Sequence, residues 1–135
     1  MKKYKVILAD PPWSYRAAIM FHDKGAMSAA NLHYKTMTID EIKSLNVQDF
    51  CAVDCALFLW ATFPNLPQAF EVINSWGFNY KTAAFVWVKR NKIANTYFFG
   101  PGNYTRANAE VCLIATKGSP TRKAKNIHQI IDARI

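Results

Sequence analysis

Short apolar runs along the chain alternate with stretches in which apolar residues recur every three or four positions. The runs are rich in β-branched residues and predict buried strands. They cover residues 4–9, 55–62, 80–89 and 109–118, and a fifth run begins within residues 127–135. Helical spacing predicts helices within residues 36–47 and 65–78. This alternation indicates an α/β fold with a mostly parallel sheet and right-handed crossovers.

The two predicted helices carry end signals. Thr38 is the expected N-cap of the first helix, and Glu41 stands three residues later, as a capping box requires. Pro67 is tolerable in the first turn of the second helix, and Gly77 is placed to end it. Residues 13–35 show no hydrophobic period and predict a long loop. A loop of this length inside a compact domain is usually functional or disordered.

The composition is that of one packed domain spanning residues 1–135, with 51% hydrophobic residues, 14% aromatic residues and no low-complexity tract. A net charge of +8 suggests nucleic acid or an anionic membrane surface as partner, with an ordinary basic soluble protein as the alternative. No apolar run is long enough to span a bilayer, and no signal peptide is recognisable. Three cysteines in apolar contexts suit a reducing compartment, so we expect a cytoplasmic protein.

Several of the predicted strands end in residues with chemical potential. Asp10 follows the first strand, Ala61 and Thr62 end the second, and Lys89 ends the third. In open α/β sheets, ligands bind outside the carboxyl ends of the strands. The sequence therefore predicts a site at this edge of the sheet.

The segment "ADPPW" has the composition of a holder for an aromatic amine. Pro11 and Pro12 have fixed φ angles and no N–H, so the turn after Asp10 is rigid. A carboxylate and a neighbouring carbonyl are suited to accept both hydrogens of an –NH₂ group, and Trp13 offers a face on which a base can stack. Adenine, cytosine and guanine all present such an amine. The alternative is a turn-capping Asp, a strand-ending Pro pair and a core Trp.

Other motifs are weaker. The segment "GPG" at 100–102 lacks the third glycine and the helix of a phosphate-binding fingerprint. Neither the histidines nor the cysteines have metal-ligand spacing, so we expect no metal site. Core packing is the expected role of Trp60, Trp76 and Trp87. Arg106 is a candidate phosphate contact, with a solvated basic loop as the alternative.

The motif "DPPW" directly after an apolar strand resembles the signature of S-adenosylmethionine-dependent amino-methyltransferases, and its Trp variant near the N-terminus resembles the MT-A family of N-6-adenine methyltransferases. Further matches follow in order along the chain: "HYKTM", "LFLWAT", "INSWGF", "FVWVK" and "GNYTRANAEVCLIATKG". The resemblance implies a Rossmann-like methyltransferase fold with helices on both faces of the sheet. It also implies a permuted motif order, with the catalytic strand ahead of the cofactor-binding segment.

The resemblance also assigns site residues. Asp10 and Pro11 are expected to accept hydrogen bonds from the adenine amine and to contact the cofactor, S-adenosylmethionine. Pro12 is expected to hold the turn, Trp13 to line or stack on the base, and Tyr34 to match a pocket tyrosine of the family.

Two basic residues complete the candidate site. Lys89 and Arg106 are expected to bind substrate, and the loop "KRNK" at 89–92 to touch phosphates or a partner subunit, which would make a homo- or heterodimer. Family members continue beyond the segment that matches residues 127–135 with an H-S-x-K-P stretch and a cofactor-holding end. We therefore expect an incomplete domain that lacks its C-terminal part.

The function implied is methyl transfer from S-adenosylmethionine to the N-6 amine of adenine. The short form is typical of bacterial or phage enzymes, which favours DNA over RNA as the substrate. The same chemistry on RNA is one alternative. A non-catalytic nucleic-acid-binding or partner subunit is the other, although the intact Asp10–Trp13 motif argues against it.

Overall fold

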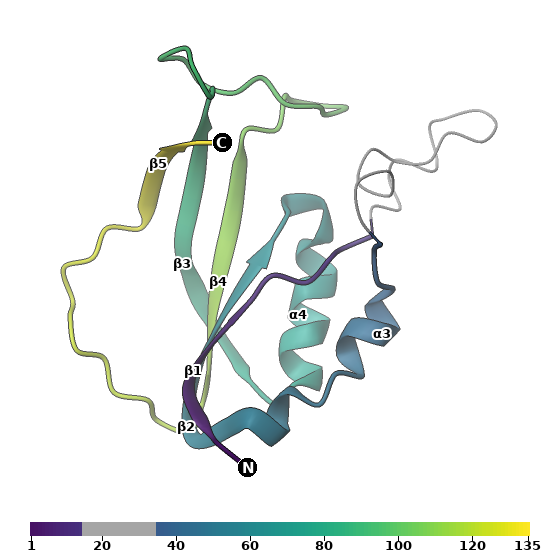
Figure 1. Ribbon diagram of the computed structural model, residues 1–135, viewed down its shortest axis with the longest axis vertical. Coiled ribbons are helices and arrows are strands. Elements are labelled where there is room, and N and C mark those ends of the chain that lie inside the picture. The colour runs from purple at the N-terminus through teal and green to yellow at the C-terminus, as the bar shows by residue number, and fades with distance from the viewer. Residues whose placement is uncertain (15–34) are drawn as a thin grey trace.

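The computed structural model describes residues 1–14 and 35–135 (Figure 1). Its described part forms a five-stranded sheet in the order β1-β2-β4-β3-β5. The strands are β1 (Tyr4–Ala9), β2 (Cys51–Ala61), β3 (Asn79–Arg90), β4 (Ala109–Lys117) and β5 (Ile130–Arg134). The helices are α3 (Ile39–Lys43) and α4 (Leu66–Ser75), with 3₁₀ turns η1 (Val47–Phe50) and η2 (Phe63–Asn65). None of these helices is long and apolar enough to cross a membrane.

The sheet is mixed, and its one reversed strand lies in the middle. β1 pairs with β2 and β3 pairs with β5 in parallel, whereas β4 pairs antiparallel with both β2 and β3. The predicted parallel direction thus holds for β1, β2, β3 and β5, and β4 departs from it. Because β4 runs the other way, its amino end meets the carboxyl ends of β1, β2 and β3 at one edge of the sheet.

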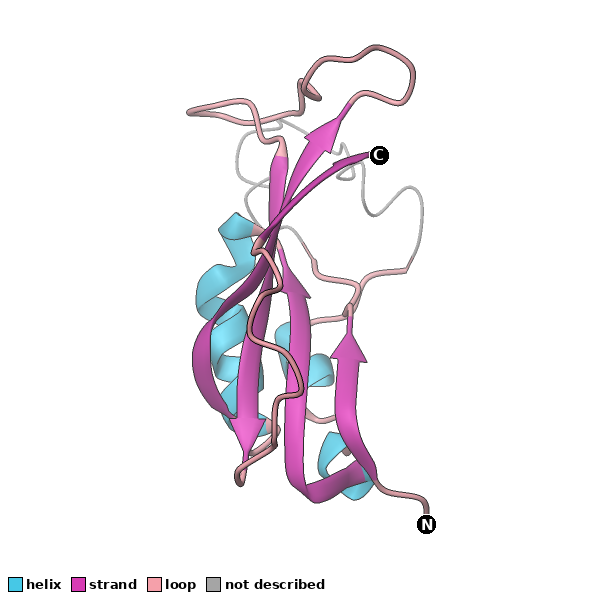
Figure 2. Cartoon of the chain, turned by 90° about the vertical axis from the view of Figure 1, so that its left-hand side faces the viewer, coloured by secondary structure: helices cyan, strands magenta, loops and turns pink. Residues whose placement is uncertain are grey.

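The core lies between the helices and one face of the sheet (Figure 2). Ile42 of α3 and Val72 and Ile73 of α4 are fully buried there against Leu57 and Leu59 of β2. Within the described residues no helix covers the opposite face. Leu8 on that face is 69% exposed. Within residues 1–14 and 35–135 the helices thus lie on one face of the sheet, and the predicted α/β architecture is confirmed.

The opposite face of the sheet is apolar where it is uncovered. The register pairs Leu8 with Phe58 and Phe58 with Ile114, so the three side chains lie on one face. Phe58 stacks on Phe85, with 6.3 Å between the ring centroids.

The predicted end signals of both helices are confirmed. Thr38 Oγ1 accepts from the Glu41 N–H, and the Glu41 carboxylate accepts from the Thr38 N–H, which completes the capping box. Gly77 follows the C-cap of α4 with φ +79°, a left-handed conformation that favours glycine. The indole N–H of Trp76 donates to the Ile42 carbonyl at 3.0 Å and ties α4 to α3.

The second strand starts earlier than predicted, at Cys51 instead of Cys55. Tyr4 pairs with Cys51 but Val6 already pairs with Ala56, so β2 bulges between these pairs. The polar Asp54 interrupts the apolar run at the bulge and hides the strand start from a pattern search. The cysteines Cys51, Cys55 and Cys112 are free and buried, as their apolar contexts predict.

Candidate active site

The turn after β1 is rigid and anchored at both prolines. Pro11 is buried, and its carbonyl accepts from the Trp13 N–H at 2.8 Å. The Pro12 carbonyl accepts from the Met37 N–H at 2.9 Å, which fastens the turn to the segment that leads into α3. A carbonyl oxygen has two lone pairs, so Pro11 keeps one for a further donor.

Trp13 packs in the hydrophobic core and also lines the cavity. It is only 6% exposed and belongs to the hydrophobic core, and it also lines the cavity beside Asp10. Its indole N–H donates to the Trp60 carbonyl at 3.0 Å. This bond pins the turn after β1 to the end of β2 and fixes the ring plane. Trp13 therefore packs in the core, as one interpretation of the sequence expected, and also lines the cavity; that a base stacks on it stays a prediction.

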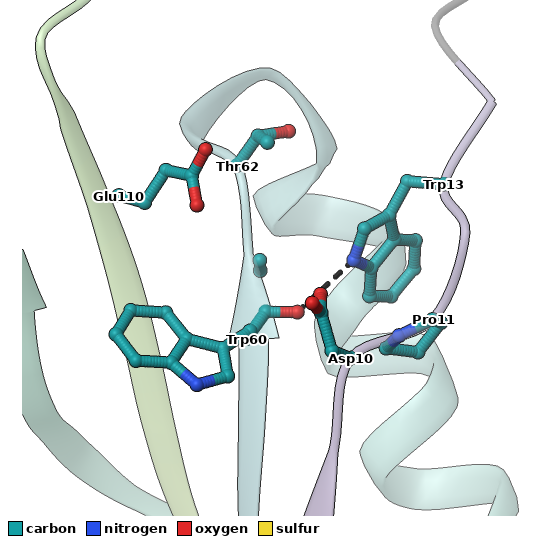
Figure 3. A pocket seen from close by; sticks show the side chains of 7 residues that line it. Asp10, Pro11, Trp13, Trp60, Thr62 and Glu110 are labelled. Carbon is teal, nitrogen blue, oxygen red and sulfur yellow. Dashed lines mark hydrogen bonds between the residues drawn. The ribbon is translucent and has the colours of Figure 1, made fainter. Parts of the chain in front are cut away.

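The residues at the shared sheet edge enclose a cavity of about 150 Å³ (Figure 3). Its lining residues are Asp10, Pro11, Trp13, Trp60, Ala61, Thr62 and Glu110. Three elements contribute them: the turn after β1, the end of β2 and the start of β4. Ala61 and Thr62 at the end of β2 line this cavity together with Asp10, at the edge that the strand ends predicted, and the functional role of this edge stays a prediction.

Sequence reasoning missed two of these lining residues. Trp60 was expected to serve in core packing, yet it is half-buried and lines the cavity, next to Ala61. The signal for Trp60 was its position next to the end of β2. Glu110 gave no such signal, because the second residue of a parallel strand would lie at the far edge of the sheet. Only the reversed direction of β4 brings it here.

Two carboxylates face the same cavity. Asp10 lies at its exposed mouth, and partial burial raises the pKa of its carboxyl group. The negative charge of Glu110 raises the pKa of Asp10 further. On β4, burial and then the charge of Asp10 raise the pKa of the Cys112 thiol to about 11. The neighbourhood of Asp10 is therefore acidic and partly dry.

Lys89 does not line the cavity itself, but it contacts Glu110, which does. Its Nζ lies 2.6 Å from Glu110 Oε1 and 5.0 Å from the ring centroid of Trp87. The Lys89 side chain is 19% exposed. The structure thus places Lys89 at the predicted edge, where it contacts Glu110.

Arg106 is not among the described residues that line this cavity. Arg106 is exposed in the β3–β4 connection, which extends beyond the same edge of the sheet (Figure 1). Its guanidinium donates to the Gly102 carbonyl at 3.2 Å and lies 5.3 Å from the ring centroid of Phe99. Tyr34, the expected pocket tyrosine, lies outside the described residues.

Comparison with known proteins gives relatives along nearly the whole chain. The Type II methyltransferase M.MunI of Mycoplasma sp is 37% identical, in an alignment that covers 96% of this chain and 59% of that protein. A probable N(6)-adenosine-methyltransferase MT-A70-like protein of Oryza sativa is 30% identical over 87% of this chain and 15% of its own length. The N6-adenosine-methyltransferase non-catalytic subunit MTB of Arabidopsis thaliana is 28% identical over 98% of this chain and 17% of its own length.

These alignments leave much of each relative uncovered, and the chain spans about six tenths of the length of M.MunI. The family model MT-A70 matches residues 4–135, which include the Asp10–Trp13 turn and every strand described above. This chain therefore belongs to the MT-A70 family.

Proposed function

We propose that this protein transfers a methyl group from S-adenosylmethionine to the N-6 amine of adenine in DNA. The observation that carries the proposal is the anchored Asp10–Trp13 turn at the carboxyl end of β1, which faces a cavity with an acidic and aromatic lining. Membership of the MT-A70 family and similarity to a type II methyltransferase support it.

Asp10 and Pro11 present two acceptors to one amine. The lone pair of an adenine amine is delocalised into the ring, so the nitrogen is a poor nucleophile. Acceptors on both amine hydrogens, the Asp10 carboxylate and the remaining lone pair of the Pro11 carbonyl, favour a pyramidal nitrogen and aim its lone pair. The turn is held by the Trp13 and Met37 amides, so this geometry exists before substrate arrives.

The cofactor supplies a methyl group that is made electrophilic by a sulfonium charge. The acidic cavity suits such a cation, since Asp10 and Glu110 both face it and the lining includes no cationic side chain among the described residues. Methyl transfer forms a carbon–nitrogen bond as the carbon–sulfur bond breaks, and the two electrons of the broken bond stay on sulfur. Asp10 stabilises the positive charge that develops on nitrogen, and its raised pKa makes it a better acceptor for the proton that then leaves.

Nucleic acid is the proposed partner. The net charge of +8 provides the attraction to phosphate that does not depend on sequence. A flipped adenine costs a few kcal/mol in a duplex, and stacking on an aromatic side chain returns about 1–3 kcal/mol. Trp13 and Trp60 are the aromatic residues of the cavity that can provide it.

A dimer is also part of the proposal, as is a cytoplasmic location. Large apolar side chains that are exposed in the connection between β3 and β4 support the dimer. They are Ile93, Tyr97, Phe99 and Tyr104. The three free, buried thiols support a reducing compartment.

RNA is the alternative substrate, because several relatives are named N(6)-adenosine-methyltransferases. A non-catalytic subunit is the other alternative, because one relative carries that name. The formed cavity and the intact motif favour catalysis over a scaffold role. DNA is favoured over RNA by the similarity to M.MunI along 96% of this chain.

The test is transfer of a labelled methyl group from S-adenosylmethionine to DNA and to RNA by the protein that its gene encodes. This protein is expected to methylate adenine in DNA, and Asp10→Ala to abolish transfer. Asp49→Ala, which removes an exposed acid on η1, is the matched control and is expected to have no effect. Absence of transfer by the unsubstituted protein, or full activity of Asp10→Ala, would refute the proposal.

A further inference from the structure

Glu110 is the charged group of the cavity whose role the proposed reaction leaves open. It is the second residue of β4, and its carboxylate points into the cavity that Asp10 enters from the other side (Figure 3). Oε1 is bound to Lys89, and the side chain is 31% exposed. Within the described part of the chain, no hydrogen bond or ion pair engages Oε2. A second acceptor therefore faces Asp10 across the cavity.

Among the residues that the structure describes, the lining of the cavity includes no cationic side chain. Lys89 is paired with Glu110 and lies over the Trp87 ring. The Thr62 hydroxyl already accepts from the Asn65 amide at 2.9 Å, and the Trp60 carbonyl from Trp13 at 3.0 Å. Two carboxylates thus dominate the polar lining. Such a surface attracts the amine hydrogens of a base and repels a base that presents a carbonyl there.

We propose that Glu110 is a specificity-determining residue that rejects bases with a carbonyl in place of the adenine amine, and that Lys89 is a positioning residue that holds Glu110. The proposal rests on the proposed function, because that function makes adenine the substrate. It gives Lys89 a different role from the phosphate contact expected from its sequence position. The two roles differ in their dependence on base identity and on salt.

The test of Glu110 is a comparison of single-stranded oligothymidines that carry one central deoxyadenosine or one deoxyinosine. Their Kd values are measured by fluorescence anisotropy with the protein that its gene encodes. Wild type is expected to bind the deoxyadenosine strand more tightly. Glu110→Gln replaces an acceptor by a donor that can pair with the inosine carbonyl, so the preference should fall about tenfold. Glu71→Gln, on the exposed side of α4, is the matched control.

Glu110→Asp keeps the negative charge and is expected to retain part of the preference. Thermal unfolding of each variant shows that the fold is intact. Equal binding of both strands by wild type, or an unchanged preference in Glu110→Gln, would overturn the role of Glu110.

Lys89→Met separates positioning from phosphate contact. If Lys89 positions Glu110, the preference for deoxyadenosine falls while the salt dependence of binding stays as in wild type. If it binds phosphate, both strands bind more weakly by the same factor and the slope of log K against log salt shrinks by about 0.7. That second result would overturn the positioning role. Lys81→Met, exposed near the other end of β3, is the control.

Methyl transfer measured on the same preparations keeps the two proposals apart. If the wild-type protein discriminates between the strands through Glu110 but transfers no methyl group, the specificity role of Glu110 is supported and the proposed reaction is refuted. If the wild-type protein methylates adenine but Glu110→Gln keeps the preference for deoxyadenosine, the proposed reaction is supported and the specificity role of Glu110 is refuted.

Discussion

Trp13 and Trp76 form a natural pair for separating stability from catalysis. Both are almost fully buried, at 6% and 2% exposure. Each indole N–H donates to a backbone carbonyl at 3.0 Å, Trp13 to Trp60 and Trp76 to Ile42. Trp13 lines the cavity, whereas Trp76 ends α4 and is not among the residues that line it. Replacing each by Phe removes the same bond and keeps an aromatic ring.

The two substitutions should destabilise the fold to a similar extent. A lost hydrogen bond costs about 0.5–1.5 kcal/mol. The smaller ring leaves unfilled space, which adds about 1 kcal/mol on the scale of large-to-small core changes. Each variant should therefore lose about 2 kcal/mol. With a urea slope of about 1–3 kcal/mol per M, the unfolding midpoint falls by roughly 1 M.

Activity should separate the pair. In Trp13→Phe the turn that carries Asp10 loses its bond to β2, and a misplacement of about 1 Å can cost about 100-fold in rate. We expect kcat/KM for adenine methylation to fall about 10- to 100-fold in Trp13→Phe and to stay near the wild-type value in Trp76→Phe, well below both unfolding midpoints. Equal losses in the two variants would refute the argument, since stability alone would then account for them. Full activity of Trp13→Phe would refute it as well.

Other predictions concern charge, backbone and thiol chemistry. Because partial burial and Glu110 raise the pKa of Asp10, its carboxylate is lost at a higher pH than that of a free Asp, and kcat/KM should fall as pH drops through that value. Glu110→Gln should move this acid limb to lower pH, and an unmoved limb in a pH–rate profile would contradict the coupling. Gly118 has φ +66°, and a Cβ there would clash with Asp54 Oδ1, so Gly118→Ala should lower the free energy of unfolding in urea by about 1–3 kcal/mol. An unchanged unfolding midpoint would contradict this. The buried Cys112 thiol, with its pKa raised to about 11, should resist iodoacetamide in native protein at neutral pH and react after unfolding, as mass spectrometry can show.

Local signals in the sequence were sufficient to predict much of the secondary structure. The strand that ends before Asp10 has the predicted bounds, because an apolar β-branched run and a Pro pair define both of its ends. The Thr38–Glu41 capping box formed as predicted, because both partners lie within one helical turn. These features depend on neighbours within a few residues, so a pattern in one sequence can reveal them.

Features that depend on pairing between distant segments could not be predicted. The bulge in β2 exists because Tyr4 and Val6 select partners five residues apart, Cys51 and Ala56. Trp60 serves both packing and the cavity because its strand ends where the turn after β1 arrives. An apolar pattern predicts that side chains are buried, but it does not predict which segment packs against them.

The reversal of β4 shows how topology adds an acid to the cavity. A parallel β4 would bring its carboxyl end, at Lys117, to the edge where Asp10 lies; the antiparallel strand brings Glu110 instead. The register then decides which face the carboxylate takes. Glu110 pairs with Trp87, so Lys89, two residues further along β3, lies on the same face and reaches Glu110 at 2.6 Å. A slip of one residue would turn the Glu110 side chain to the helix-covered face and leave its charge buried without Lys89. The Lys89–Glu110 pair thus favours the register that places the second carboxylate opposite Asp10.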